Sequence, residues 1–311
     1  MENNLLLSKF WARIWALFID SIILGIFGFI LGSIFYNFFT SLGENAKLIG
    51  WIISLFYFSI LNSKLYKGQT FGKKILNIKV VDINGDFIDL KKSFVRALIL
   101  TTPFFINGLK IKGLSTFSPI SVIQGLVIST IGLGIIIFYI FNKATRQSLH
   151  DLAVKTYVVQ DYKNDKITVM PKIKKLPFYI TAGIFVVTLG ISFYTYNSDL
   201  KLSKLIPVYE EINKQDHISR ASVSINYLTN RDKSNIYTVN ISVDRTPQNQ
   251  SIKNPELLQA AKTFINSNAY ESDNDILNMV VVSGFDIGIA SKYQSFSFNK
   301  PISEWKKDLK K

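Results

Sequence analysis

Two charged residues, Arg13 and Asp20, stand inside the first long apolar segment of the chain, FWARIWALFIDSIILGIFGFILG, at residues 10–32. In a helix their spacing of seven residues puts them on one face, but about 10.5 Å of axial rise separates them, so each needs another partner. A carboxylate inside a membrane segment can bind a cation or take up a proton. It can equally fasten neighbouring helices together by hydrogen bonds. The sequence leaves both roles open for Asp20.

A stripe of small residues runs beside this face and predicts how the face is packed. Ser21, Gly25, Gly28 and Gly32 leave room for another helix to approach closely. We therefore expect Asp20 to point into a helix bundle and not into lipid.

The stretch GQTFGKK, residues 68–74, invites comparison with a phosphate-binding loop. The spacing does not fit, because only three residues separate Gly68 from Gly72 and Lys73 is followed by Lys74 instead of Ser or Thr. We expect the two glycines to shape a turn and the lysines to face the membrane surface.

The other candidate for chemistry is RQSLHD, residues 146–151, where His150 stands beside Asp151. Such a pair serves hydrogen bonding at a membrane interface far more often than catalysis. The chain has no Cys and its second histidine is His217, so disulfides and a structural zinc site are not expected. No nucleophile, base and orienting group come together in the sequence, and we expect neither an enzyme nor a cofactor.

The apolar runs predict five membrane-spanning helices, at about 14–39, 48–62, 94–109, 119–141 and 178–196. The loops at 63–92 and 142–177 are rich in Lys and Arg and both belong in the cytoplasm, so both runs between them must cross. The N-terminus is then inside and residues 197–311 are outside. Alternatively, 94–109 is an amphipathic helix on the membrane surface, with Arg96 among the lipid headgroups.

Charge separates the chain into two parts. Residues 1–196 carry 21 Lys and Arg against nine Asp and Glu, whereas residues 197–311 carry 15 against 13. Cytoplasmic loops that orient a membrane protein explain the basic excess of the apolar part, so nucleic acid is not an expected partner. The expected partner of this part is the lipid bilayer.

Alternating apolar and polar residues predict strands in both parts. ILNIKVVDINGDFIDL alternates around Asn84-Gly85, a strong hairpin signal, and AVKTYVVQ at 153–160 is a strand that could pair with the resulting ribbon. Past Asn197, alternating stretches and a helical pattern after Asn254 predict an α+β domain that folds by itself.

Three stretches together resemble the RDD family of bacterial integral membrane proteins: R-x(6)-D in the first span, GQTFGKKILNIKVVD after the second, and RQSLHDLAVKTYVV after the fourth. The resemblance covers residues 8–160. Arg13 and Asp20 match the first Arg and Asp of the family name, and Asp151 is taken as the second Asp, with Asp82 as the alternative. The remaining motif residues are Gly68, Gln69, Thr70, Gly72, Lys73 and His150.

The resemblance implies a multi-pass protein of the bacterial cytoplasmic membrane. Some family members are described as sodium–proton antiporters, which implies exchange of Na⁺ or another monovalent cation for protons at a polar cluster of Arg13, Asp20 and Asp151. The other function left open is a non-transporting scaffold or assembly factor that presents the C-terminal domain to a protein partner outside the membrane.

The predicted fold combines these elements. It is an α-helical multi-pass membrane bundle with a small cytoplasmic β-ribbon over residues 1–177, a fifth transmembrane helix at 178–196, and an extracytoplasmic α+β domain at 197–311.

Overall fold

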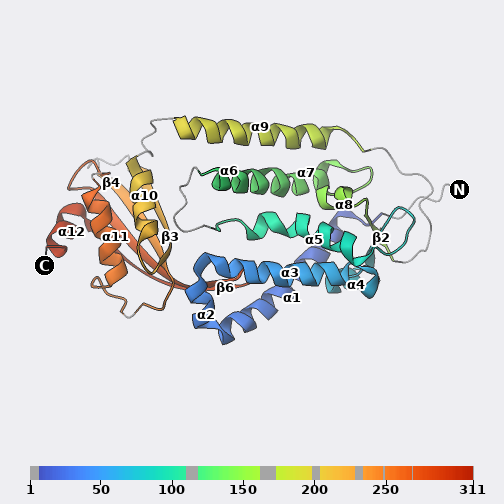
Figure 1. Cartoon of the computed structure of the whole chain (residues 1–311), viewed down its shortest axis with the longest axis horizontal. Coiled ribbons are helices and arrows are strands. Elements are labelled where there is room, and N and C mark those ends of the chain that lie inside the picture. Colours follow the sequence, from blue (N-terminus) through green and yellow to red (C-terminus); the bar gives the residue numbers. More distant parts are fainter. Residues whose placement is uncertain are drawn as a thin grey trace.

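Long helices and a small mixed sheet occupy opposite ends of the computed structural model (Figure 1). The structure describes residues 7–109, 118–161, 173–197, 204–227, 234–247, 249–267 and 269–310. The first part contains α1 (Phe10–Ile34), α2 (Tyr36–Leu42), α3 (Lys47–Leu61), α4 (Phe71–Ile75), β1 (Ile78–Val81), α5 (Leu90–Phe105), α6 (Pro119–Leu126), α7 (Leu133–Phe141), α8 (Leu149–Ala153), β2 (Tyr157–Gln160) and α9 (Leu176–Asn197). The second contains α10 (Leu205–Lys214), β3 (Ile218–Tyr227), β4 (Asn235–Val243), α11 (Pro255–Asn266), β5 (Ile276–Asp286), β6 (Ser291–Pro301) and α12 (Ile302–Asp308).

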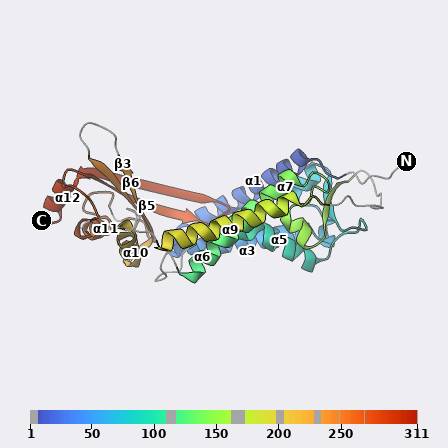
Figure 2. The same ribbon diagram turned by 90° about the horizontal axis from the view of Figure 1, so that it is seen from above.

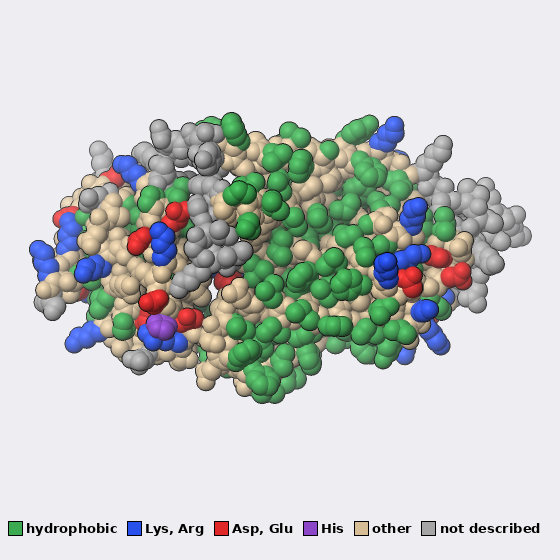
Figure 3. Space-filling view, viewed as in Figure 1, with side chains coloured by type: hydrophobic (Ala, Val, Ile, Leu, Met, Phe, Trp, Pro, Cys, Tyr) green, Lys and Arg blue, Asp and Glu red, His purple; other side chains and the backbone are tan. Residues whose placement is uncertain are grey.

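Among the described residues, four helical stretches are long and apolar enough to cross a membrane: Phe10–Ile34, Tyr36–Leu61, Pro119–Phe141 and Leu176–Tyr194. In Figure 1, α9, α6 with α7, and α3 run roughly parallel to one another, and α1 crosses obliquely beside α3. On the face drawn in Figure 3, hydrophobic side chains cover the middle of the bundle, and charged side chains gather towards its far end and over the C-terminal domain. A bilayer would cover such an apolar belt, so the fold is that of a multi-pass membrane protein.

Helix α5 lies among these helices, although Pro103 and Arg96 interrupt its apolar run. It packs along α3, and Trp51 Nε1 donates a hydrogen bond of 3.0 Å to Thr101 Oγ1. Arg96 is only 3% exposed, which does not fit a helix that lies flat with this side chain among headgroups. That α5 crosses the bilayer stays a prediction.

The β-ribbon exists, but the expected hairpin is wrong. Strand β1 pairs antiparallel with the distant β2, from Ile78 opposite Gln160 to Val81 opposite Tyr157. Asn84-Gly85 forms a turn, and residues 86–89 form no strand after it. This short segment instead leads directly into α5, whose first turn it caps through the Asp89 side chain.

The C-terminal domain is a four-stranded sheet in the order β3-β4-β5-β6, covered on one face by α10, α11 and α12. Neighbouring strands are antiparallel except for β4 and β5, which are parallel and joined through α11. Asn254 caps α11 by accepting the Leu257 N–H at 2.9 Å, and Trp305 of α12 is fully buried. This part of the chain therefore combines helices and a sheet around a hydrophobic core of its own. That it folds by itself stays a prediction.

The β5–β6 hairpin extends from this domain onto the membrane helices (Figure 2). At Gly32 of α1, an added Cβ would lie 2.2 Å from the Phe285 ring, and at Gly50 of α3 it would lie 1.7 Å from the Ile287 carbonyl oxygen. Ile289 packs next to Gly28 in the same way. The three glycines of the small-residue stripe therefore receive a β-hairpin, and the expectation of another helix there is wrong, while Ser21 of the same stripe is exposed.

Ion pairs accompany this apolar contact. Lys47, at the start of α3, lies 3.3 Å from Asp286 on the hairpin and 2.7 Å from Glu44. Arg220 of β3 lies 3.4 Å from the same Glu44. The sheet is thus joined to the helices at two of its strands.

Gly50→Ala should destabilise the whole protein, because the new methyl group would overlap the Ile287 backbone. Overpacking of this kind costs about 1–3 kcal/mol, so we expect a lower thermal unfolding midpoint in detergent. Gly190→Ala on α9 is the matched control, since its Cβ would meet nothing within 4 Å. Equal midpoints for the two variants would contradict the docked hairpin.

Candidate functional site

Asp20 is buried on α1 and accepts three hydrogen bonds from other elements of the bundle. The Tyr57 hydroxyl of α3 donates to Oδ1 at 2.7 Å, and the Thr70 hydroxyl donates to Oδ2 at 2.6 Å. The Gly72 backbone N–H of α4 adds a third bond to Oδ1 at 2.8 Å. Protein groups have therefore replaced the water that an ionised carboxylate would otherwise require.

The GQTFGKK motif provides two of these donors because it folds α4 against α1. Thr70 is the N-cap of α4 and accepts the Lys73 N–H at 3.3 Å. An added Cβ on Gly72 would lie 2.1 Å from the Ala16 carbonyl oxygen, so only glycine allows this approach. Ala16 is one turn before Asp20, which puts both contacts on the same face of α1.

The first two residues of the motif connect it to the ribbon. Gly68 has φ +68° and accepts the Val80 N–H at 2.9 Å, and a Cβ there would lie 2.3 Å from the Val80 carbonyl oxygen. Gln69 donates through Nε2 to the Ile78 carbonyl at 3.1 Å. The predicted turn is confirmed at Gly68, whereas Gly72 lies in α4. Lys73 does not face the membrane surface, because its side chain is buried, but Lys74 is exposed.

Asp151 forms the second buried carboxylate site. It lies in the first turn of α8, where Ser148 and Asp151 make a capping box and the Ser148 N–H donates to Oδ2 at 3.2 Å. Arg96 of α5 donates to Oδ1 through Nε at 2.9 Å and through a terminal nitrogen at 2.7 Å. Arg13 of α1 forms an ion pair with Oδ2. One carboxylate therefore joins three helices.

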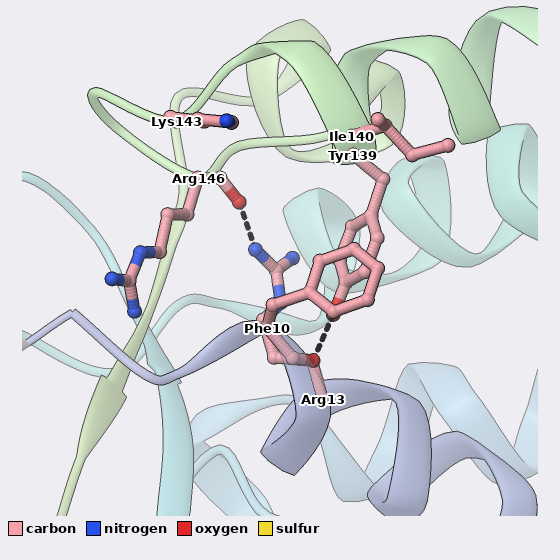
Figure 4. A pocket seen from close by; sticks show the side chains of 6 residues that line it. All are labelled: Phe10, Arg13, Tyr139, Ile140, Lys143 and Arg146. Atoms are coloured by element: carbon pink, nitrogen blue, oxygen red, sulfur yellow. Dashed lines mark hydrogen bonds between the residues drawn. The ribbon is translucent and has the colours of Figure 1, made fainter.

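Arg13 is held on several sides. Besides Asp151, it donates to the carbonyl oxygen of Arg146, and its guanidinium lies over the Tyr139 ring, 4.9 Å from the centroid (Figure 4). The side chain therefore connects the start of α1 to the chain segment after α7.

Lys73 and His150 complete the buried polar region. Lys73 Nζ donates to Asn62 Oδ1 at 2.6 Å, and His150 Nε2 lies 3.5 Å from Asp151 Oδ1. Burial lowers the pKa of Lys73 to about 7, with Arg96 and Arg13 lowering it further and Asp20 and Asp151 opposing them. Burial also lowers the pKa of His150 to about 3, so its imidazole is neutral near pH 7.

The pKa of Asp151 is also shifted by its surroundings, and here the neighbouring cations outweigh burial. Burial alone would raise the pKa of its carboxyl group, but His150, Arg96 and Arg13 outweigh this effect and hold the pKa well below its usual range. The carboxylate therefore stays charged and paired under ordinary conditions.

The predicted cluster is thus divided between two sites. The structure brings Arg13 together with Asp151 but gives Asp20 a different set of partners. Asp82, the alternative second Asp, lies in the turn and accepts the Asn84 N–H at 2.9 Å, away from the buried groups. Sequence reasoning did not assign Arg96 to the site, although an arginine inside an apolar run was the available signal.

Together, the apolar helices and internally paired charges define a polytopic membrane protein with its polar side chains gathered inside the bundle. Residues 7–155 match the RDD family, so this part of the chain is an RDD-family domain, as its motifs indicated. The C-terminal α+β domain lies beyond the matched residues. No curated protein and no solved structure matches the chain.

Substitutions of Asp20 should separate loss of charge from loss of hydrogen bonds. Asp20→Asn keeps one acceptor for Tyr57 and Gly72, and its amide can donate to the Thr70 hydroxyl, so we expect a small change in folded yield. Asp20→Leu removes the acceptor of all three donors, at about 1–3 kcal/mol each, and should greatly reduce the monodisperse fraction in detergent.

Ser21→Leu is the control for added apolar bulk, because Ser21 is exposed and its hydroxyl donates to the Leu17 carbonyl within α1. If Asp20→Leu purified as well as Ser21→Leu, the hydrogen bonds at Asp20 would not be holding the bundle.

Proposed function

We propose that the protein is a non-transporting membrane scaffold that holds its C-terminal domain in a fixed orientation on the outer surface. The observation that carries the proposal is the docked β5–β6 hairpin. Phe285 and Ile287 fill the space over Gly32 and Gly50, so α1 and α3 are both packed against the same hairpin. Helices fixed in this way suit a platform better than an alternating-access transporter, whose elements must move past one another.

The surroundings of Asp20 support the same function. Tyr57, Thr70 and Gly72 all direct hydrogen-bond donors at its carboxylate, whereas a cation site needs oxygen acceptors directed at a common point. A cation could bind only after these donors had been displaced. The domain outside the membrane is then the part that a protein partner would meet, and no catalytic role is proposed for the chain.

The orientation belongs to this proposal. The basic loops argue for a cytoplasmic N-terminus and ribbon, and for residues 197–311 on the outer side of a bacterial cytoplasmic membrane. Reporter fusions at Asn84 and Lys163 should be active in the cytoplasm, and a fusion at Ser224 should be active outside. An outer signal at Lys163, or an inner one at Ser224, would refute this topology.

Cation–proton exchange is the second candidate, and Lys73 is the observation that favours it. Its buried amine has a pKa of about 7, and the charges of Asp20 and Asp151 both raise this pKa against the effect of burial. Such a group can gain and lose a proton near physiological pH, which is one requirement for exchange.

Proton flux in vesicles decides between the two functions. For the scaffold we expect no Na⁺- or K⁺-dependent proton movement above that of empty vesicles from about pH 6 to 9, either for the natural protein or for Asp20→Asn. Cation-dependent flux in the natural protein that disappears in Asp20→Asn or Lys73→Met would favour exchange instead. Monodisperse size-exclusion profiles for both variants are required, so that misfolding is not mistaken for lost transport.

A further inference from the structure

A pocket of about 370 Å³ opens between the start of α1 and the end of α7 (Figure 4). It is lined by Phe10, Arg13, Tyr139, Ile140, Lys143 and Arg146. The Tyr139 hydroxyl donates to the Phe10 carbonyl at 2.9 Å, and the two rings pack with centroids 4.7 Å apart. One wall of the pocket is therefore a fixed aromatic pair.

The polar wall of the pocket has an excess of positive charge. Arg13 shares Asp151 with Arg96, so one carboxylate serves two guanidinium groups. Within the described residues, neither Lys143 nor Arg146 forms an ion pair with a carboxylate. The positive charges that line the pocket thus exceed the negative charges paired with them, so the pocket suits an anion.

Arg146 is positioned by the backbone around it. Its φ is +53°, its guanidinium donates to the Ser8 carbonyl at 2.8 Å, and its own carbonyl accepts from Arg13. Lys143 is exposed at the opening. A bound anion would therefore meet one exposed ammonium group and guanidinium groups that already have hydrogen-bond partners.

The pocket lies where the apolar belt ends. Helix α1 begins at Phe10 and α7 ends at Phe141, and both helices expose apolar side chains directly beside the pocket: Trp11 is 66% exposed and Ile140 is 46% exposed. A ligand with a phosphate group alone would use only the cationic wall. A phospholipid would also cover the adjacent apolar side chains with its acyl chains.

We infer that this pocket binds the headgroup of an anionic phospholipid. Lys143 and the guanidinium groups of Arg13 and Arg146 supply the positive charge that attracts the phosphodiester, and the acyl chains run along the exposed faces of α1 and α7. By the charge of the neighbouring loops this is the cytoplasmic leaflet, where basic groups between helices attract anionic lipids. A scaffold and a transporter could both carry such a site, and only its assignment to the cytoplasmic leaflet rests on the orientation given under the proposed function.

Titration of the full-length protein in a neutral detergent with phosphatidylglycerol tests the inference, with phosphatidylcholine of the same acyl chains for comparison. Native mass spectrometry counts the lipids bound. We expect one phosphatidylglycerol to bind at least about tenfold more tightly than phosphatidylcholine, and Lys143→Gln/Arg146→Gln to weaken it by about tenfold or more, since each charge-assisted contact contributes strongly. Lys143→Gln alone, at an exposed residue, should give a smaller loss in the same direction.

Lys174→Gln/Lys175→Gln is the matched control, because it removes the same charge from two exposed lysines just before α9 that do not line the pocket. The affinity of this control variant for phosphatidylglycerol should stay within about twofold of the affinity of the natural protein. If both double variants lost phosphatidylglycerol affinity equally, general surface charge would explain the binding and the inference would be overturned. Displacement of the lipid by millimolar glycerol 3-phosphate would also overturn it, by showing a site for soluble phosphates.

Discussion

A carboxylate in an apolar helix must obtain its hydrogen bonds from the protein, and the architecture of the membrane half depends on this requirement at Asp20. Lipid offers the side chain no partner, so a tyrosine from α3 and the segment around α4 come to it. Once α4 is held against α1, the chain that follows has only a short distance to β1. The carboxylate therefore determines where the polar ribbon begins.

The same requirement operates at Asp151, with a different result. Two arginines reach one carboxylate from α1 and α5, and each of the three charges would be costly if its partners were removed. This pairing explains how Arg96 can lie in an apolar helix. Together the two carboxylates connect α1 to α3, α4, α5 and α8, while the β5–β6 hairpin packs against the same α1 from the C-terminal domain.

Much of this arrangement could be predicted from local sequence. Apolar runs located the helices, alternation located β3 to β6, and the motifs identified Asp20, Thr70, Gly72 and Asp151. What could not be predicted were contacts between distant segments. A glycine stripe permits close approach but does not say what approaches, and Asn84-Gly85 favours a turn without specifying that β1 pairs with β2. Likewise, an arginine in an apolar run needs a partner, but its spacing does not name Asp151.

The coupling between Asp20 and Thr70 tests the central claim most directly. Thr70→Val, Asp20→Leu and the double variant would be unfolded reversibly in mixed detergent micelles, and the capping bond that Thr70 accepts from Lys73 cancels in such a cycle. A coupling free energy between about 0.5 and 3 kcal/mol is predicted, since the two side chains contact each other. If the changes in unfolding free energy of the two single variants summed to that of the double variant within about 0.3–0.5 kcal/mol, the account would be contradicted.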